Sequence, residues 1–219
     1  QAFVLWYPAD RIAFMNGVAF SAGALGAMTA TVPLELALRA FGWRDIFVAL
    51  AVATIAVAAV LYFFVPERKH ERKAETLAVQ LAGVAAILRD PAFWRVGIAL
   101  CTSQAATVAL LTLWMTTWLR DVAGFSLAEV AQALLAVNVA LIAGYLGYGR
   151  AADAVARRGR SALPLFAGGI ACASACLAVI AFGTTAGSVL TWALFIFFGA
   201  ASTVAYPMLS RRYPRGMAG

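Results

Sequence analysis

Six long runs without a charged residue set the strongest limit on how this chain folds. Each run has at least 20 residues, and about 20 apolar helical residues cross the ~30 Å hydrocarbon core of a bilayer. No tract alternates with the period of two that a membrane β-strand requires. The sequence therefore predicts an all-α polytopic membrane protein with six complete transmembrane helices, at residues 12–34, 46–65, 96–119, 130–149, 161–187 and 188–210.

The basic residues divide unequally between the two sides of these spans. If the segment before the first span lies inside the cell, the inside loops hold fourteen basic residues (Arg11, Arg68, Lys69, Arg72, Lys73, Arg89, Arg95, Arg150, Arg157, Arg158, Arg160, Arg211, Arg212 and Arg215). The outside loops hold Arg39, Arg44 and Arg120. Basic loops stay in the cytoplasm. This alternation predicts a multi-pass protein of the cell inner (plasma) membrane, with loops 66–95, 150–161 and 210–216 cytoplasmic. The net charge of +7 is thus a loop bias and indicates no nucleic-acid partner.

The longest inside loop combines a charge run with a helical pattern. It opens with "PERKHERK" at residues 66–73. Leu77, Leu81, Val84 and Leu88 then recur at helical spacing, and Pro91 follows. This pattern predicts an amphipathic helix that lies along the inner membrane surface and ends before the proline.

Two spans carry stripes of polar and aromatic side chains, whereas residues 46–65 and 165–182 carry almost none. Unpaired polar groups are costly in lipid, so a stripe indicates either the wall of a solute cavity or helix contacts through small and hydroxyl side chains. Both interpretations stay open. The candidate cavity residues are Gln104, Thr107 and Trp114 on one stripe, Trp192, Ser202 and Tyr206 on another, and Asn138 on a third span.

The first span is rich in small residues. Gly17, Gly23 and Gly26 permit close approach of a neighbouring backbone. We predict that this helix packs tightly.

Other kinds of chemistry find little support in the sequence. No Asp, Glu, Lys or Arg lies in the middle of a span, so these helices contain no evident proton or ion relay. There is no phosphate-binding loop and no Ser/His/Asp or metal-ligand constellation. Cys101, Cys172 and Cys176 are best interpreted as packing residues, and His70 as a surface residue. We therefore expect that the protein is not an enzyme and that it binds no cofactor and no metal.

Residues 147–160, "GYGRAADAVARRGR", resemble a loop motif of the major facilitator superfamily, the twelve-helix secondary transporters. In the motif G-x-x-x-D-R-x-G-R-R/K, Gly149, Asp153, Arg157 and Arg158 match the first glycine, the acid and the two final basic positions. Ala154 and Ala156 replace the internal arginine and the second glycine. "GWRDIF" (42–47), "VPERK" (65–69) and "SRRYP" (210–214) are similar in order and spacing, so the resemblance covers essentially the whole chain.

The resemblance implies an internal fragment that runs from the end of helix 4 to the start of helix 11. Residues 1–65 would end the N-terminal half, residues 66–92 would link the halves, and residues 93–219 would begin the C-terminal half. Helices 7 and 10 would line the cavity. Gly149, Asp153, Arg157 and Arg158 would form a conformational gate in which the acid holds a neighbouring helix on the cytoplasmic side. The local alternative is an i, i+4 pair between Asp153 and Arg157.

The function that the resemblance implies is alternating-access secondary active transport of a small solute, with a lean to an organic anion or metabolite. The expected partners are the lipid bilayer, the solute and H⁺ or another coupling ion, with the protein as a monomer. Drug or metabolite efflux by proton antiport is the alternative, although the first span lacks the Gly-Pro pair of the antiporter signature. An integral-membrane protein without transport activity is a further one.

Overall fold

The computed structural model describes residues 7–8, 11–29, 32–64, 77–183, 185 and 187–212. Within them every regular element is a helix. The order is α2 (Ile12–Thr29), α3 (Val32–Ala40), α4 (Trp43–Phe64), α5 (Leu77–Arg89), α6 (Pro91–Ala109), the π-helical turn η1 (Leu110–Trp114), α7 (Met115–Asp121), α8 (Leu127–Arg157), α9 (Leu163–Phe182), α10 (Ser188–Gly199), the 3₁₀ stretch η2 (Ala200–Val204) and α11 (Ala205–Arg212). Residues 1–6, most of the segment that the resemblance assigns to the end of helix 4, lie outside the described residues, as do the charge run at 66–73 and residues 213–219.

Six helical stretches are long and apolar enough to cross a membrane, which confirms the six predicted spans. One span joins α6, η1 and α7, and another joins α10, η2 and α11. The first span ends at Thr29, earlier than predicted, and α3 begins anew at Val32 with Pro33 in its first turn. Proline is tolerated there because the first N–H groups of a helix have no intrahelical partner.

Helix α8 is longer than its charge-free run. It continues to Arg157, so most of the predicted loop at 150–161 is helix. Four alanines between Arg150 and Arg157 favour this continuation, because alanine has the highest helix propensity. The helix starts at a capping box in which the Ser126 Oγ accepts from the Glu129 N–H and the Glu129 carboxylate accepts from the Ser126 N–H. It ends before Gly159, which has a φ of +67°.

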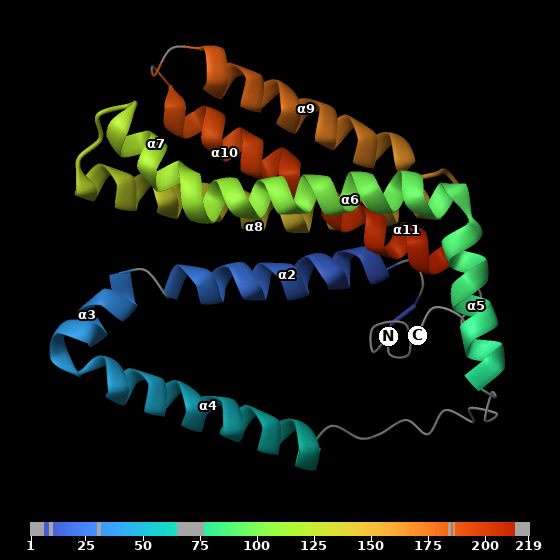
Figure 1. Ribbon diagram of the computed structural model, residues 1–219, viewed down its shortest axis with the longest axis horizontal. Helices are drawn as coiled ribbons and strands as arrows, with labels where there is room; N and C mark the ends of the chain where they lie inside the picture. Colours follow the sequence, from blue (N-terminus) through green and yellow to red (C-terminus); the bar gives the residue numbers. More distant parts are fainter. Residues whose placement is uncertain are drawn as a thin grey trace.

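The bundle is built around α8. This helix contacts α2 on one side and α10, η2 and α9 on the other, whereas α4 has no buried residue and lies apart (Figure 1). The core gathers large side chains from α7, α8 and α10, among them Met115, Val137, Trp192 and Ile196. Helix α5 stands crosswise at one end of the bundle (Figure 1), with Leu81, Val84 and Leu88 exposed.

One end of the bundle collects the segments that the charge pattern places inside the cell. The starts of α2, α6 and α9 and the ends of α8 and α11 meet there, since all five line one hollow. We call this the basic end, because Arg150, Arg157, Arg158 and Arg160 lie at it. It is the end where α5 crosses (Figure 1).

Candidate functional site

The carboxylate of Asp153 lies at the start of α2, on a helix 140 residues earlier in the chain. Its Oδ1 accepts a hydrogen bond from the Ala13 N–H at 3.2 Å, and its Oδ2 accepts one from the Phe14 N–H at 2.8 Å. The first N–H groups of a helix lack intrahelical acceptors, and the helix dipole favours a negative charge there. Because the first turn of α2 has no acidic residue of its own, α8 supplies this charge.

Burial makes the interaction tight. Asp153 is 2% exposed, and a buried carboxylate without hydrogen bonds would be strongly destabilising. Because Asp153 accepts hydrogen bonds from the backbone of α2, its contacts extend beyond its own helix. A purely local i, i+4 pair with Arg157 would not account for these two bonds. Its role as a gate stays a prediction.

Two glycines let α2 and α8 approach closely enough for this contact. A Cβ on Gly149 would lie 2.9 Å from the Ala13 carbonyl oxygen and 3.0 Å from the Phe14 Cα. A Cβ on Gly17 would collide with the Tyr145 carbonyl oxygen. At Gly23 and Gly26 an added Cβ would meet no atom within 4 Å. Of the three glycines of the first span, Gly17, Gly23 and Gly26, Gly17 alone lies in a close helix contact among the described residues.

The basic residues of the motif occupy different positions around the acid. Arg157 and Arg158 are exposed at the end of α8, where positive charge favours the C-terminal end of the helix dipole. Arg150, which the motif does not specify, has its guanidinium carbon 4.3 Å from the centre of the Phe14 ring. This cation–π contact is a second link between α8 and the start of α2, and the sequence gives no signal for it.

Three of the predicted cavity residues lie together where α6 meets α10 and η2. The Oε1 of Gln104 accepts a hydrogen bond from the Ser202 Oγ at 2.8 Å. Thr107 packs against Gly199, where an added Cβ would lie 2.8 Å from the Thr107 Oγ1. We call Gln104, Thr107 and Ser202 the polar junction.

The remaining predicted cavity residues are dispersed. Trp192 is 1% exposed and packs in the core, with its ring centre 5.9 Å from that of Trp118. Asn138 is buried and its Nδ2 donates to the Leu134 carbonyl of its own helix. Trp114 is 61% exposed. The structure therefore does not bring Trp114, Asn138 or Trp192 to the polar junction.

The π-helical turn explains the position of Trp114. The sequence stripe assumes 3.6 residues per turn from Gln104 to Trp114. In η1 the Met115 N–H donates to the Leu110 carbonyl five residues earlier, as a π-helix requires. This wider turn rotates the residues that follow it away from the stripe, and nothing in the sequence announces it.

Tyr206 belongs to an aromatic cluster that the sequence did not predict as a unit. The Phe20 ring of α2 lies 5.4 Å from the ring of Tyr145 on α8 and 5.7 Å from the ring of Tyr206 on α11, measured between centres. The sequence predicts tight packing for the helix that carries Phe20. No sequence pattern distinguishes Phe20 from the other apolar residues of that helix. We call these three residues the aromatic cluster.

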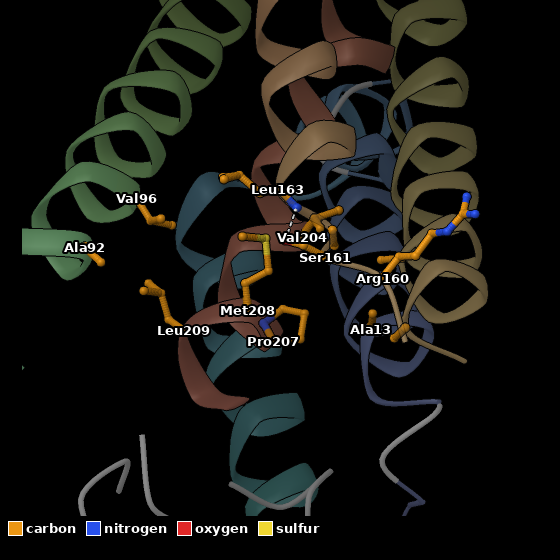
Figure 2. Close-up of a pocket in the computed structure, with 13 residues that line it drawn as sticks. Ala13, Ala92, Val96, Arg160, Ser161, Leu163, Val204, Pro207, Met208 and Leu209 are labelled. Atoms are coloured by element: carbon orange, nitrogen blue, oxygen red, sulfur yellow. Dashed lines mark hydrogen bonds between the residues drawn. The ribbon is translucent and has the colours of Figure 1, made fainter. Parts of the chain in front are cut away.

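A hollow of about 350 Å³ opens at the basic end (Figure 2). Its walls are largely apolar, with Val96, Leu163, Met208 and Leu209 among them, and the guanidinium of Arg160 points away from it (Figure 2). None of the predicted cavity residues lines this hollow. It is therefore distinct from the polar junction and from the aromatic cluster.

Comparison with known proteins gives one family. The sequence profile of the Major Facilitator Superfamily matches residues 2–219. The chain is 30% identical over 111 residues to "Probable transporter SCO4007" of Streptomyces coelicolor, which covers 51% of the chain and 24% of that protein. It is also 30% identical over 134 residues to "Putative transporter AraJ" of Escherichia coli, covering 59% of the chain and 32% of that protein.

The matched segments thus span between a quarter and a third of these relatives' lengths. No solved structure matches the chain. The family match extends over nearly every residue and agrees with the six helical spans and the motif around Asp153. The chain is a multi-pass membrane protein that belongs to the Major Facilitator Superfamily.

Proposed function

We propose that this chain forms the central part of an alternating-access secondary transporter that moves a small organic solute across the inner (plasma) membrane. The observation that carries the proposal is the double hydrogen bond from the start of α2 to the Asp153 carboxylate. By the family resemblance, α2 is helix 5 of the N-terminal half and α8 is helix 8 of the C-terminal half. The contact therefore joins the two bodies whose relative rocking would open the basic end.

The energetics suit a latch that can be broken. A hydrogen bond to a charged group contributes about 1.5–3 kcal/mol, so two such bonds favour the closed basic end by a few kcal/mol at most. When the halves separate, the freed carboxylate and N–H groups would be hydrated, which offsets much of that loss. A difference of ~1.4 kcal/mol between two states changes their ratio tenfold. The contact is thus strong enough to bias the cycle and weak enough to be reversed.

The family assignment specifies neither the solute nor the ion to which its movement is coupled. We infer an organic anion or metabolite, moved with or against H⁺ or another ion. The polar junction offers hydrogen-bonding groups for a polar solute. No described span has an acidic or basic residue in its middle, so the charge partner and the coupling residue would lie in other helices of the full-length transporter. Measuring both uptake and efflux in proteoliposomes distinguishes this proposal from efflux by proton antiport.

The test of the latch is Asp153→Asn in the full-length protein. Asparagine keeps the size and one acceptor but removes the charge. We expect uptake to slow by about fivefold to tenfold, with an unchanged amount of protein in the membrane, because the closed basic end loses stability. Asp121→Asn is the matched control, since Asp121 is exposed at the end of α7. An unchanged uptake rate in Asp153→Asn would reject the latch.

A further inference from the structure

Helix α8 holds Phe14 in two different ways. The Phe14 N–H donates to the Asp153 Oδ2 at 2.8 Å, and the guanidinium carbon of Arg150 lies 4.3 Å from the centre of the Phe14 ring. A cation within about 6 Å of a ring centre is attracted by the negative face of the ring. Phe14 lies in the first turn of α2 and is half-buried. The backbone and the ring of this one residue are therefore both held by α8.

The α8 residues that contact Phe14 lie close together. Asp153 follows Arg150 by three residues in a regular helix, so the two share a helix face. Gly149, next to Arg150, lets the α8 backbone approach the Phe14 Cα, which would lie 3.0 Å from an added Cβ. The acid, the cation and the close backbone approach thus act on the same residue of α2.

The ring contact acts where a helix is least stable. Helix ends fray, and the first N–H groups of a helix have no intrahelical acceptor. Asp153 accepts from the Ala13 and Phe14 N–H groups only while the first turn of α2 keeps its geometry. A planar guanidinium stacks well on an aromatic face. Arg150 therefore restrains the Phe14 side chain and, through it, the backbone that binds the acid.

We propose that Arg150 is a positioning residue of the latch, the pair of hydrogen bonds from the start of α2 to Asp153. Its guanidinium holds the Phe14 ring, and the ring keeps the Phe14 N–H on the carboxylate while the basic end is closed. The inference rests on the proposed function and adds a contact that the motif does not specify. Because Arg150 is exposed, its contact belongs to the weaker cation–π interactions. We expect it to raise the ratio of latched to unlatched protein about threefold, which corresponds to about 0.7 kcal/mol.

A simpler role for Arg150 is that of a positive charge that keeps this end of α8 in the cytoplasm. That role needs the charge alone and does not involve the Phe14 ring. Phe14→Leu separates the two roles, because leucine keeps an apolar side chain and the backbone N–H but removes the ring.

The experiment measures amide hydrogen exchange at residues 12–16 of the full-length protein by mass spectrometry. Phe14→Leu and Arg150→Gln should each speed exchange about threefold after correction for intrinsic rates, because these N–H groups exchange when they leave the carboxylate. The double variant should exchange no faster than either single variant, since both changes remove the same contact. Phe14→Tyr keeps a ring and should retain the wild-type rate. Exchange in α9 should stay unchanged in every variant, which shows that the bundle is folded.

Two control variants match these changes. Arg160→Gln removes an exposed cation at the same end, whose guanidinium points away from the hollow that Ala13 lines (Figure 2). Phe47→Leu removes an exposed ring that contacts Trp43 of its own helix, α4. Both should exchange as the wild type does. Wild-type exchange in Phe14→Leu, or additive effects of Phe14→Leu and Arg150→Gln, would overturn the proposal.

A distance measurement separates this contact from the proposed function. Spin labels at Arg11→Cys and Arg160→Cys, in a protein without other cysteines, report how far α2 lies from the end of α8. If exchange responds as expected but the labels show a single distance with and without solutes, the halves do not rock, so the proposed function fails and the role of Arg150 stands. If the labels show two distances in a ratio that Phe14→Leu does not change, and exchange is unchanged as well, the role of Arg150 fails and the proposed function stands.

Discussion

The backbone of Gly17 on α2 lies directly against the carbonyl oxygen of Tyr145 on α8, with no room for a Cβ between them. One turn away, Gly149 makes the reciprocal approach from α8 to the backbone of Ala13 and Phe14. Each helix thus contributes one glycine to the interface. Because Asp153 is one turn beyond Gly149, this close approach is what brings its carboxylate within reach of the α2 N–H groups.

Gly17→Ala should destabilise the protein, whereas Gly23→Ala should not. The Gly17 methyl would force α2 away from α8 at a cost of about 1–3 kcal/mol, as overpacked interfaces show. Gly23 has free space around its Cβ position, so alanine there should be neutral or stabilising by up to ~1 kcal/mol. Thermal unfolding of the purified protein in detergent checks both variants. Equal unfolding temperatures for the two would show that the contact at Tyr145 does not hold the helices.

Gln104 and Ser202 should be energetically coupled. We expect the Ser202→Ala and Gln104→Leu effects on stability to be non-additive by about 0.5–1.5 kcal/mol, the size of interhelical hydrogen bonds in membranes. Denaturant titration of both single variants and the double variant measures this coupling. Thr112→Val is the control, because the Thr112 hydroxyl donates within its own helix, to the Val108 carbonyl. Strict additivity would mean that the bond between α6 and η2 contributes nothing to stability.

Hydropathy and loop charge predict the number of spans because a bilayer imposes one dominant requirement on each segment. The first and last residues of each helix depend on weaker, local preferences of the sequence. Helix α3 begins at Val32 with Pro33 in its first turn, and the alanines after Arg150 extend α8 through a segment that charge alone predicts to be a loop. The position of the amphipathic helix is also predictable, since α5 occupies Leu77–Arg89 within the periodic tract.

The candidate site is less predictable because it depends on which helices touch. The acid Asp153 stands out as a lone carboxylate after a long apolar run, but the sequence does not say that it meets Ala13 and Phe14. Helical spacing groups Gln104 with Trp114, and the π-helical turn separates them. Trp192 lies on a polar and aromatic stripe that predicts a cavity wall. In the structure it is instead buried in the core together with Met115 and Phe195.

Cysteine labelling should place the two ends of the bundle on opposite sides of the membrane. In a protein with Cys101, Cys172 and Cys176 replaced by alanine, Val122→Cys should react with a membrane-impermeant maleimide in right-side-out spheroplasts. Arg158→Cys should react only in inside-out vesicles. The excess of arginine at the end of α8 predicts this orientation. Labelling of both cysteines from the same side would contradict the topology, and reversed labelling would contradict the orientation.

Helix α5 should rest on the inner membrane surface. Leu81, Val84 and Leu88 are exposed, and the Trp94 indole N–H donates to the Leu88 carbonyl at 2.8 Å, which fixes the end of α5 to the start of α6. Exposing an apolar helix face to water is unfavourable unless lipid or protein covers it. Interfacial helices bury such a face beside the lipid headgroups. A spin label at Val84→Cys in liposomes should therefore be more accessible to oxygen than to a water-soluble nickel chelate. The same label at Arg89→Cys should show the opposite preference, because Arg89 is a charged residue at the end of the helix. Equal nickel accessibility at the two positions would mean that α5 stands free in the cytoplasm and that the link between the halves is not anchored to the bilayer.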